Sequence, residues 1–597
     1  MSLETAAGAA LGVACSLTGR AWRMRTVNER LAAQLSQRFS LDDLVGRVLA
    51  GRGVTAETAA DFLVPSLKSG LPDPSTLEDM DVAAERIATA IIGGEQVAVF
   101  GDYDVDGATS SALLDRFFRA VGGRLRVYIP DRIREGYGPN AAALERLASE
   151  GASLVVTVDC GTLAYDALEA AAEAGLETIV IDHHKAEPRL PRALAVVNPN
   201  RLDESGEYGQ LAAVGVTFLL VVAVNRALRQ AGWYRGGRRE PDLLAWLDLV
   251  ALGTVCDVVP LTGPNRAFVA QGLKVMARRG NAGLAALSDV ARLDRAPGVY
   301  HLGFLLGPRV NAGGRVGEAG LGARLLACDD PAESREIAER LDLFNEERQA
   351  LEAQVLEAAA AHIAARFGGE SPHPIVFAAG EGWHPGVIGI AAARLVERFG
   401  RPSFVLGVDE TGLAKGSARS ITGVDIGAAV IDAQAAGVIA QGGGHAMAAG
   451  FSLPADGLEA FERFLAERLE KKVTAARAGR SLELDGTLAP KGCRVELMES
   501  LESVGPFGIG NPAPRFALPR VELVKADVVG KDHLRAIFAG GDGGRIKAMA
   551  FRQAYEPLGE ALLRGLGARF HIAGRLKRDD WGPTPKVEMT LEDAAKA

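Results

Sequence analysis

The apolar positions of the chain change their spacing along its length, and each spacing predicts a different kind of element. In residues 27–87 apolar side chains such as Leu31, Leu35 and Leu44 recur at roughly helical spacing, which predicts short helices. Further along, apolar runs alternate with Ala-rich amphipathic segments such as 110–121 and 165–175. The runs lie at 96–100, 125–130, 154–158, 177–181 and 194–198. Alternation of strands and helices predicts βαβ units and a mainly parallel sheet.

A long helical pattern with few breakers covers 341–367, and a second α/β segment follows from Pro374 to about 472. Because the second segment starts directly after this helix, we expect the helix to bridge two α/β domains rather than to pack inside one. The last part of the chain has short strands divided by turn signals. These strands lie at 520–525, 533–538, 545–551, 569–576 and 586–591. Their number and spacing predict a small β-barrel.

Length and composition limit the class of protein. At ~150 residues per domain, 597 residues predict several domains. The chain is 48% hydrophobic and 24% charged, which excludes a largely disordered protein. Its net charge of -9 is unusual for a dedicated nucleic-acid coat protein. If the chain binds nucleic acid, the positive surface must be local or bound metal must help.

The cysteines and two apolar segments indicate the cellular compartment in which the protein works. The 5 cysteines form no C-x-x-C pair, so we expect no disulfide framework and a reducing cytoplasm. The apolar run at 211–224 is too short to span a bilayer and predicts a buried helix. Residues 1–19 are apolar but carry Glu4 and lack a basic start, which favours a disordered extension over a signal peptide.

Acidic and histidine motifs follow the apolar runs of the first α/β segment. They supply Asp102, Asp104, Asp106, Asp159, Asp182, His183, His184 and Asp257. Ligands of open α/β sheets bind at the carboxyl ends of the strands, so these side chains should converge at one edge. Closely packed carboxylates repel each other, and divalent cations relieve that repulsion. Histidine nitrogen mixed with carboxylate oxygen suits Mn²⁺ or Mg²⁺ better than a structural zinc, which prefers thiolates.

Each motif taken alone has a simpler interpretation. Asp104 and Asp106 fit a turn or a helix N-cap, because Gly107 follows them. The two histidines fit surface or satisfied core positions, and Asp257 fits a buried cap. The ordered set in one sheet favours a metal site, and two cations are the usual arrangement for in-line attack on phosphorus. For Asp102, capping and direct ligation both remain open.

The motifs D-Y-D-V-D-G at 102–107, V-D-C-G at 158–161, D-H-H at 182–184 and G-T-V-C-D-V-V-P-L at 253–261 resemble those of the DHH phosphoesterase superfamily. Further segments resemble its single-strand-specific 5′→3′ DNA exonucleases, and the resemblance extends from Trp22 to the C-terminus. These segments are 129–130, 135–138, 307–315, 345–348, 382–389, 416–420, 442–445 and 448–450.

The resemblance implies a multidomain α/β fold in which a parallel-sheet DHH domain is joined by a long helix to a smaller α/β domain, with a C-terminal barrel. The expected segments are a disordered extension at 1–25, a helical N-terminal region at 26–90, the DHH catalytic domain at 91–290, a connecting segment with the bridging helix at 291–370, the DHH-associated substrate-binding domain at 371–472 and an oligonucleotide-binding (OB) barrel at 480–597.

The resemblance also implies roles for single residues. The implied metal ligands are Asp104, Asp106, Asp159, His183 and Asp257, with Asp102 and His184 as further candidates. The implied catalytic residues are His184, Asp159 and Arg309, and His184 resembles a residue that ligates metal or contacts the scissile phosphate. Many superfamily members have a histidine four residues before the first ligating aspartate, where this chain has Phe100. Phenylalanine cannot ligate, so Asp102 or water must replace it.

Basic and glycine-rich motifs suggest where a nucleic acid binds. We expect a glycine-rich turn at 307–315, an anion-binding nest at 416–420 and, after the G-G-G-H of 442–445, a helix at 446–450 whose N–H groups hold a phosphate. By resemblance, part of this set forms a pocket for a 5′-terminal phosphate. The candidate phosphate- or DNA-binding residues are Arg309, Asn311, Arg315, Ser417, Arg419, Gly443, Gly444, His445 and His384.

Together these features predict a divalent-metal-dependent 5′→3′ exonuclease that hydrolyses single-stranded DNA to 5′-mononucleotides in DNA repair and recombination. The expected cofactors are two divalent ions, Mn²⁺ or Mg²⁺. We expect a monomer that acts on single-stranded DNA, with a single-strand-binding protein or a helicase as protein partners and no membrane. The alternatives are a DHH hydrolase of short oligonucleotides, cyclic dinucleotides or pyrophosphate, and a non-catalytic DNA-binding scaffold.

Overall fold

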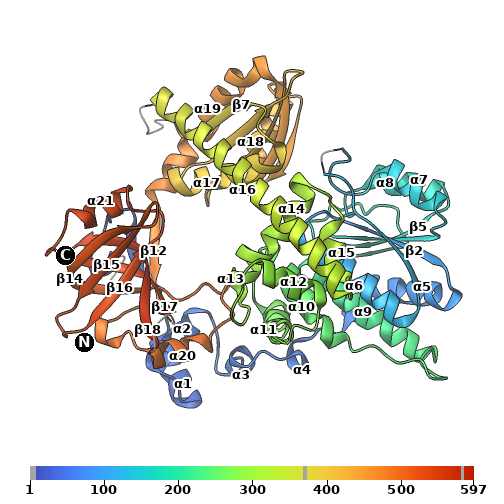
Figure 1. Cartoon of the computed structure of the whole chain (residues 1–597), viewed down its shortest axis with the longest axis horizontal. Coiled ribbons are helices and arrows are strands. Elements are labelled where there is room, and N and C mark those ends of the chain that lie inside the picture. Colours follow the sequence, from blue (N-terminus) through green and yellow to red (C-terminus); the bar gives the residue numbers. More distant parts are fainter. Residues whose placement is uncertain (1–7, 133, 368–372, 580–583) are drawn as a thin grey trace. The chain divides into compact units, whose positions relative to one another are not determined.

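The computed structural model describes residues 8–132, 134–367, 373–579 and 584–597 (Figure 1). The chain divides into two compact units. The first unit comprises Met1–Leu71, Pro260–Ala267 and Arg480–Ala597, and the second comprises Pro72–Val259 and Phe268–Gly479. Each unit is therefore built from segments that are distant in the sequence.

The second unit begins with the predicted parallel sheet, whose strand order is β3-β2-β4-β5-β6. Its strands are β2 (Gln96–Gly101), β3 (Arg124–Tyr128), β4 (Leu154–Val158), β5 (Glu177–Ile181) and β6 (Ala195–Val197), and all of their pairings are parallel. The central strand β4 is buried along its whole length, because helices cover both faces of the sheet. The prediction of an α/β fold with a parallel sheet is confirmed.

Helices pack against this sheet and form the core of the domain with it. The face formed by Ala98, Phe100, Val155 and Val180 packs against α7 (Ala141–Ser149) and α8 (Tyr165–Glu173). The other helices of this region are α5 (Met80–Gly93), α6 (Val105–Val121) and α9 (Ala213–Gln230). Helix α9 is long and apolar enough to cross a membrane by length and composition, but 72% of the relevant window is buried inside the protein. It is a core helix, as the apolar run predicts.

A helical region follows the sheet, and one of its helices lies where a turn was predicted. Its helices are α10 (Leu247–Cys256), α11 (Gly263–Ala277), α12 (Ala282–Val290), α13 (Val299–His301), the π-helical turn η4 (Leu302–Leu306), α14 (Gly307–Val316) and α15 (Leu321–Ala327). The glycine-rich turn predicted at 307–315 is wrong, because this segment is helix α14. Its glycines allow close packing instead: a Cβ at Gly314 would lie 2.8 Å from the carbonyl oxygen of Tyr103.

The long helix α16 runs from Pro331 to Phe367, so it starts earlier than predicted. Proline suits the first turn of a helix, where its missing N–H has no intrahelical acceptor. The first half of α16 packs with α12 and α14, and its second half packs with α17 (Pro385–Phe399) and β7 (Val376–Glu381). One helix thus contacts both α/β parts of the second unit (Figure 1).

The second sheet of this unit has the order β10-β11-β9-β8-β7. Its other strands are β8 (Ser403–Val408), β9 (Leu413–Arg419), β10 (Gln441–His445) and β11 (Ala448–Pro454), and its other helices are α18 (Ile426–Ala435) and α19 (Leu458–Ala478). The helix predicted at 446–450 is wrong. Glycine favours helix poorly, and here β10 and β11 form an antiparallel hairpin in which Gly444 pairs with Ala449.

The first unit contains the predicted barrel, with strand order β13-β14-β15-β16-β18-β17 and closure by β14–β17 pairing. Its strands are β13 (Gly486–Thr487), β14 (Phe516–Val529), β15 (His533–Ala539), β16 (Arg545–Ala550), β17 (Arg569–Asp579) and β18 (Lys586–Lys596), with helices α20 (Val495–Glu502) and α21 (Pro557–Leu563). The helices α1 (Glu29–Phe39), α2 (Asp43–Gly51), α3 (Ala59–Leu63) and α4 (Leu67–Gly70) complete the unit. The prediction of a small C-terminal barrel is confirmed.

The predicted disorder of 1–25 is wrong for the described part of that segment, while residues 1–7 lie outside the described residues. Strand β1 (Ala21–Met24) pairs in parallel with β12 (Ser481–Leu484). Trp22 is fully buried, and its Nε1 donates to Asp593 Oδ2 at 3.0 Å. Ser16 Oγ donates to the same oxygen at 2.7 Å. A buried carboxylate needs such donors, so the N-terminal segment is held on the last strand.

Replacing Trp22 should therefore loosen the first unit. We expect Trp22→Ala to lower the stability of this unit by about 3–5 kcal/mol, the usual cost of removing a buried tryptophan. The measurement is denaturant-dependent hydrogen exchange of amides in β12 and β18. Arg23→Ala, at the exposed neighbouring position, serves as the matched control and should change little. Unaltered exchange in Trp22→Ala would show that the segment does not stabilise the barrel.

Candidate metal centre and anion site

The acidic residues lie together because of the strand register. Gly101 at the end of β2 pairs with Val158 of β4, and Val158 pairs with Ile181 of β5. The residues that follow are Asp102, Asp159 and Asp182, so three carboxylates leave the sheet at the same edge. This is the carboxyl edge at which α/β sheets bind their ligands.

Helix ends bring the remaining acids to this edge. Asp104 caps α6, since its Oδ1 accepts hydrogen bonds from the backbone N–H groups of Asp106 at 2.8 Å and Gly107 at 3.2 Å. Both Asp106 oxygens accept N–H bonds from the start of α9, at 2.7 Å from Ala213 and 2.9 Å from Val214. Gly107 permits the tight approach, because a Cβ there would lie 2.4 Å from the Asp102 carbonyl oxygen.

The side chains of these residues form overlapping groups with metal-binding geometry. His183 Nε2 lies 3.3 Å from Asp159 Oδ1, 3.5 Å from Asp257 Oδ2 and 3.9 Å from Asp106 Oδ2. In each group the ligand atoms lie within 4.8 Å of one another. The groups are Asp102, Asp104 and Asp159; Asp159, His183 and His184; and Asp106, His183 and Asp257. All five ligands implied by the sequence motifs lie in this cluster.

Unsatisfied buried atoms indicate that the cluster holds cations. Among the described residues, Asp102 Oδ1, Asp159 Oδ1, His183 Nε2 and Asp257 Oδ2 are buried and have no hydrogen-bond partner. Buried polar atoms in folded proteins nearly always have a partner. Because these atoms belong to the residue types that bind Mn²⁺ and Mg²⁺, divalent cations fit the cluster. For Asp102, the free oxygen favours ligation over capping, since Asp104 is the cap.

The pKa values express the electrostatic cost of this cluster without cations. Burial and the Asp104 charge raise the pKa of Asp102 to about 8. Burial and the Asp106 charge raise the pKa of Asp257 to about 9. Burial and the neighbouring His184 lower the pKa of His183 to about 4, so this ring is neutral and can ligate. A bound cation favours the ionised carboxylates and removes the penalty.

Asp182 has a different role from its neighbours. Its Oδ1 accepts from the His183 N–H at 2.7 Å, and lies 2.8 Å from His184 Nδ1. Its Oδ2 accepts from the Thr162 N–H at 3.0 Å. Although burial acts to raise the pKa of Asp182, the hydrogen bonds from His184 and Thr162 hold it well below its usual value. Asp182 is therefore an ionised residue that orients His184 rather than a metal ligand.

Phe100 lies in the core of the sheet. Its ring is fully buried and packs 5.3 Å from the ring of Tyr128, among residues of α7 and α8. It offers no ligand atom, and the free Asp102 oxygen is a candidate replacement for the missing donor.

Next to the acids the structure assembles a group of arginines, here called the arginine cluster and comprising Arg132, Arg315 and Arg419. Burial and the charges of Arg132, Arg348 and Arg419 lower the pKa of Arg315 to about 10. Arg419 Nη1 donates to Ser417 Oγ at 3.2 Å, and the Arg132 guanidinium lies 5.0 Å above the Tyr103 ring. Among the described salt bridges none joins these three arginines to an acid. Buried like charges need a counter-ion, so the cluster favours an anion.

The fold brings the arginines together through close helix packing. Arg315, on α14, donates from Nη1 to the Gly386 carbonyl oxygen at 3.0 Å. A Cβ at Gly389 of α17 would lie 2.9 Å from Ser417 Oγ and 3.2 Å from Arg419 Nη2. The absence of a side chain at Gly389 leaves room for Ser417 and Arg419 beside α17. The sequence analysis did not include Arg132 among the candidate residues. Its position between the I-P segment at 129–130 and the E-G-Y-G segment at 135–138 could have indicated it.

Other predicted phosphate-binding residues are engaged elsewhere. Arg309 Nε donates to Asp342 Oδ1 at 2.8 Å and its Nη1 donates to the Leu305 carbonyl oxygen at 2.8 Å. Asn311 lies on the same helix, α14. His384 caps α17 by accepting the Gly386 N–H at 3.1 Å. Gly443, Gly444 and His445 lie in strand β10 rather than at a helix start. Arg309 and His384 thus have partners within the protein, and the phosphate-binding roles of all these residues stay predictions.

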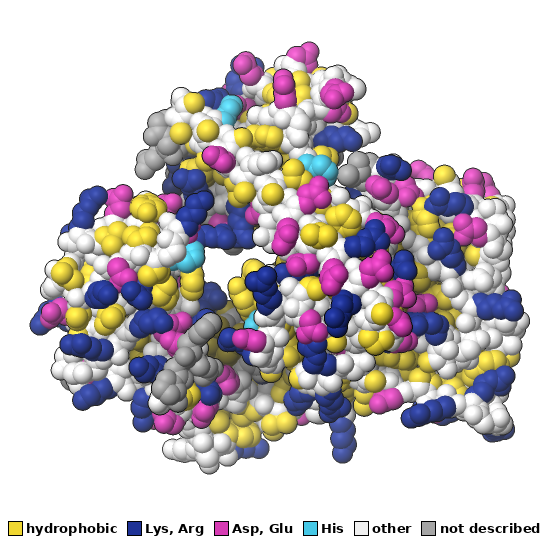
Figure 2. Space-filling view, viewed as in Figure 1, with side chains coloured by type: hydrophobic (Ala, Val, Ile, Leu, Met, Phe, Trp, Pro, Cys, Tyr) yellow, Lys and Arg dark blue, Asp and Glu magenta, His cyan; other side chains and the backbone are white. Residues whose placement is uncertain are grey.

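The barrel offers both rings and charges. His533 and Phe551 form an edge-to-face pair with centroids 5.4 Å apart, and Phe551 is 48% exposed. Several predicted contact cations are already paired, since Lys547 binds Asp579 and Glu588, and Arg535 binds Asp527. Figure 2 shows cationic and anionic side chains interspersed over the visible face, in agreement with the low net charge.

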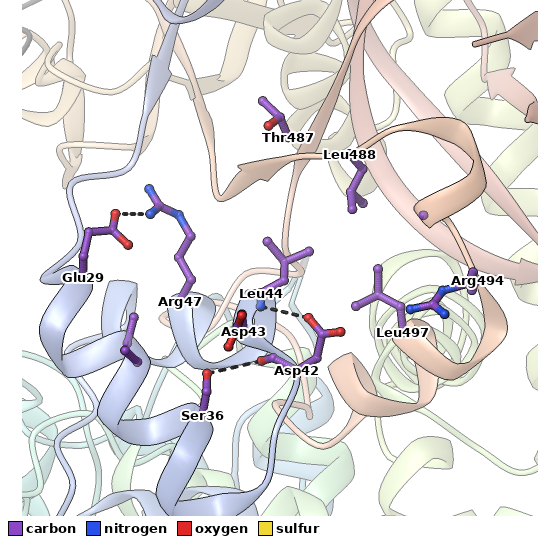
Figure 3. A pocket seen from close by; sticks show the side chains of 13 residues that line it. Glu29, Ser36, Asp42, Asp43, Leu44, Arg47, Thr487, Leu488, Arg494 and Leu497 are labelled. Atoms are coloured by element: carbon purple, nitrogen blue, oxygen red, sulfur yellow. Dashed lines mark hydrogen bonds and ion pairs between the residues drawn. The ribbon is translucent and has the colours of Figure 1, made fainter. Parts of the chain in front are cut away.

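A pocket of about 540 Å³ lies in the first unit, between the α1–α2 region and the segment before α20 (Figure 3). Its charged groups are partly satisfied. Arg47 pairs with Glu29, and Asp42 accepts the Leu44 N–H at 2.9 Å and, through its carbonyl oxygen, the Ser36 hydroxyl at 3.5 Å. This pocket contains none of the candidate metal-binding residues, which lie at the sheet edge of the second unit.

The chain matches three family models: the N-terminal domain of the DHH family at residues 96–254, the DHHA1 domain at 373–473 and the RecJ OB domain at 484–593. It is 36% identical over 533 residues to the single-stranded-DNA-specific exonuclease RecJ of Dickeya dadantii, covering 87% of this chain and 90% of that protein. The Escherichia coli protein of the same name is 36% identical over 512 residues, covering 84% and 88%.

Solved structures give the same result. The crystal structure of RecJ from Thermus thermophilus in complex with Mn²⁺ matches with a TM-score of 0.79 and 28% identity, covering 96% of this chain and 79% of that one. A second structure, exonuclease RecJ bound to manganese, matches with a TM-score of 0.57 and 32% identity, covering 68% of this chain and 98% of that one.

Cation binding should stabilise the second unit. Because a cation binds the folded cluster and not the unfolded chain, we expect Mn²⁺ at 100 times its Kd to add about 2.7 kcal/mol of stability. Thermal unfolding with and without Mn²⁺ measures this shift, and EDTA should reverse it. Asp159→Ala should abolish the shift, whereas Asp166→Ala, exposed on α8, should keep it. A full shift in Asp159→Ala would place the cations elsewhere.

Proposed function

The chain belongs to the RecJ family of single-stranded-DNA-specific exonucleases, and on that premise we propose that it removes 5′-mononucleotides from single-stranded DNA in the 5′→3′ direction. It is a hydrolase of phosphodiester bonds, an exodeoxyribonuclease that works with Mn²⁺ or Mg²⁺. The observation that carries the proposal is the arrangement in one unit of two complementary sites. One is a cluster of unsatisfied acidic and histidine atoms, and the other is the adjoining arginine cluster.

The two sites lie close enough to act on one strand. Gly314 of α14 packs on the Tyr103 carbonyl, directly before Asp104, and Asp104 influences the pKa of Arg315. In the proposed complex Arg132, Arg315, Arg419 and the Ser417 hydroxyl bind the 5′-terminal phosphate through charge-assisted hydrogen bonds. The next phosphodiester then lies at the acidic cluster. Anchoring the terminus at a fixed place explains both the direction of cleavage and the release of single nucleotides.

The residues at the acidic cluster have two kinds of role, namely binding cations and stabilising charge on the phosphate. Asp102, Asp104, Asp106, Asp159, His183 and Asp257 would hold the cations. Cations bound there would supply Lewis-acid activation of the phosphate and of the attacking water. His184, oriented by Asp182, faces the scissile phosphate and offsets charge that develops on its nonbridging oxygens. Water adds to phosphorus, the bond from phosphorus to the 3′-oxygen breaks, and that oxygen leaves with a proton.

The barrel favours a long strand over a small substrate. Exposed rings such as Phe551 can stack on bases, each stack contributing ~1–3 kcal/mol to binding. A hydrolase of cyclic dinucleotides or pyrophosphate needs no such surface, so this alternative has less support. We propose a cytoplasmic monomer in DNA repair and recombination, where a helicase or a single-strand-binding protein would present the strand.

The proposed activity is tested with a 5′-phosphorylated single-stranded oligonucleotide and Mn²⁺, by following product sizes over time. We expect mononucleotides to appear from the 5′ end from the first time points. Asp159→Ala and a blunt duplex of the same sequence are the controls and should give no product. Cleavage of short oligonucleotides only would favour the small-substrate hydrolase. Strand binding without cleavage would favour the non-catalytic scaffold.

The arginine cluster should determine the preference for a phosphorylated end. Arg419→Ala removes charge-assisted hydrogen bonds worth about 1.5–3 kcal/mol, so we expect kcat/KM on the 5′-phosphorylated strand to fall roughly 10- to 100-fold. On a 5′-hydroxyl strand the loss should be much smaller. Arg398→Ala, exposed on α17, is the matched control. Equal losses on both strands would show that Arg419 does not recognise the terminal phosphate.

A further inference from the structure

The loop between β3 and α7 carries a tyrosine whose hydroxyl reaches the metal centre. The Tyr137 hydroxyl lies 3.1 Å from the backbone carbonyl oxygen of Asp159 and 3.3 Å from Nδ1 of His184. Its ring meets the His184 ring edge to face, with centroids 5.9 Å apart. The residue is 55% exposed, so one end of its side chain faces solvent while the hydroxyl is inserted among metal-centre residues.

The local sequence E-G-Y-G holds this tyrosine in place. Gly136 and Gly138, on either side of Tyr137, have φ of +83° and +80°. This left-handed conformation is accessible to glycine without strain. Glu135 fixes the loop, because its carboxylate accepts the Asp131 N–H at 2.8 Å and the Tyr128 hydroxyl at 2.5 Å. Each residue of the segment thus contributes to the position of the Tyr137 hydroxyl.

The hydrogen-bond pattern assigns the protons. The ionised Asp182 carboxylate accepts only, so His184 Nδ1, at 2.8 Å from it, must carry a hydrogen. The Tyr137 hydroxyl therefore cannot donate to Nδ1 and donates to the Asp159 carbonyl oxygen instead. Its oxygen, 3.3 Å from Nδ1, is then a second acceptor for the Nδ1–H beside Asp182.

The carbonyl that Tyr137 binds belongs to a strained residue. Asp159 has φ of +62°, a conformation that residues other than glycine adopt at a cost and only where the surroundings impose it. The hydroxyl thus contacts two groups at once, namely the backbone of a candidate metal ligand and the ring of His184. In proteins, partners that orient such groups typically affect activity or metal affinity 10–100-fold.

We propose that Tyr137 is a positioning residue of the exonuclease, whose hydroxyl fixes the His184 ring, together with Asp182, so that Nε2 points at the scissile phosphate. The role rests on the proposed function, but it concerns a residue outside the acidic motifs and the arginine cluster. Its hydroxyl acts without touching the substrate. The exposed part of the ring has no role in this proposal.

The test is Tyr137→Phe, which keeps the ring and removes the hydroxyl. On a 5′-phosphorylated strand with saturating Mn²⁺, we expect kcat to fall roughly 10-fold with KM unchanged. The matched control is Tyr165→Phe, whose hydroxyl contacts Glu187 and the Arg189 carbonyl oxygen at the surface of α8 and which should change neither constant. A change confined to KM would overturn the proposal, because it would mean that Tyr137 contacts the strand directly.

A spectroscopic measurement separates this inference from the activity itself. In metal-free protein labelled with ¹⁵N-histidine, the His184 signals are assigned by their loss in His184→Gln. Tyr137→Phe should shift them and Tyr165→Phe should not. Unshifted His184 signals, or an unchanged kcat, would overturn the positioning role. If the wild-type protein failed to cleave single strands, the proposed function would fail, while a shift of the His184 signals would still support the contact.

Discussion

The repulsion among buried carboxylates is the constraint on which the second unit depends. Asp102, Asp106, Asp159 and Asp257 share one small volume, and burial together with the charges of neighbouring aspartates raises the pKa of each. The fold supplies only part of the compensation, through the N–H groups at the start of α9 that bind Asp106. Bound cations would relieve the remaining repulsion, and they would thereby couple the stability of this unit to its chemistry.

The arginine cluster, in the same unit, gathers positive charges where the acidic cluster gathers negative ones. Positive groups from α14, β9 and the loop after β3 meet without acidic partners among the described salt bridges. Acids and arginines therefore each lack a counter-charge, although they belong to the same unit. A strand of phosphates with bound cations satisfies both. This division of charge explains how a chain with net charge -9 can bind a polyanion: the positive surface is local, and metal offsets the acids.

Glycine packing makes this arrangement possible. Gly107 lets α6 start against Asp102, Gly314 lets α14 lie on Tyr103, and Gly389 lets α17 approach Ser417 and Arg419. In each case a Cβ would come within 3 Å of a neighbouring atom. These three glycines thus serve as points of close contact between elements that carry charged side chains.

The sequence by itself determined most of the element types and the set of candidate metal-binding residues, because both depend on local patterns. Apolar periodicity located the parallel sheet, the long helix and the barrel, and acids placed directly after strands must meet at one edge. Only the tertiary structure decided what depends on contacts distant in the chain. Trp22 is held by Asp593, and residues 448–450 begin strand β11 by pairing with β9 and β10. Arg309 pairs with Asp342, while Arg132 and Arg419 lie near Arg315. No local pattern specifies which acid will lie beside an arginine, since that choice follows from how the elements pack.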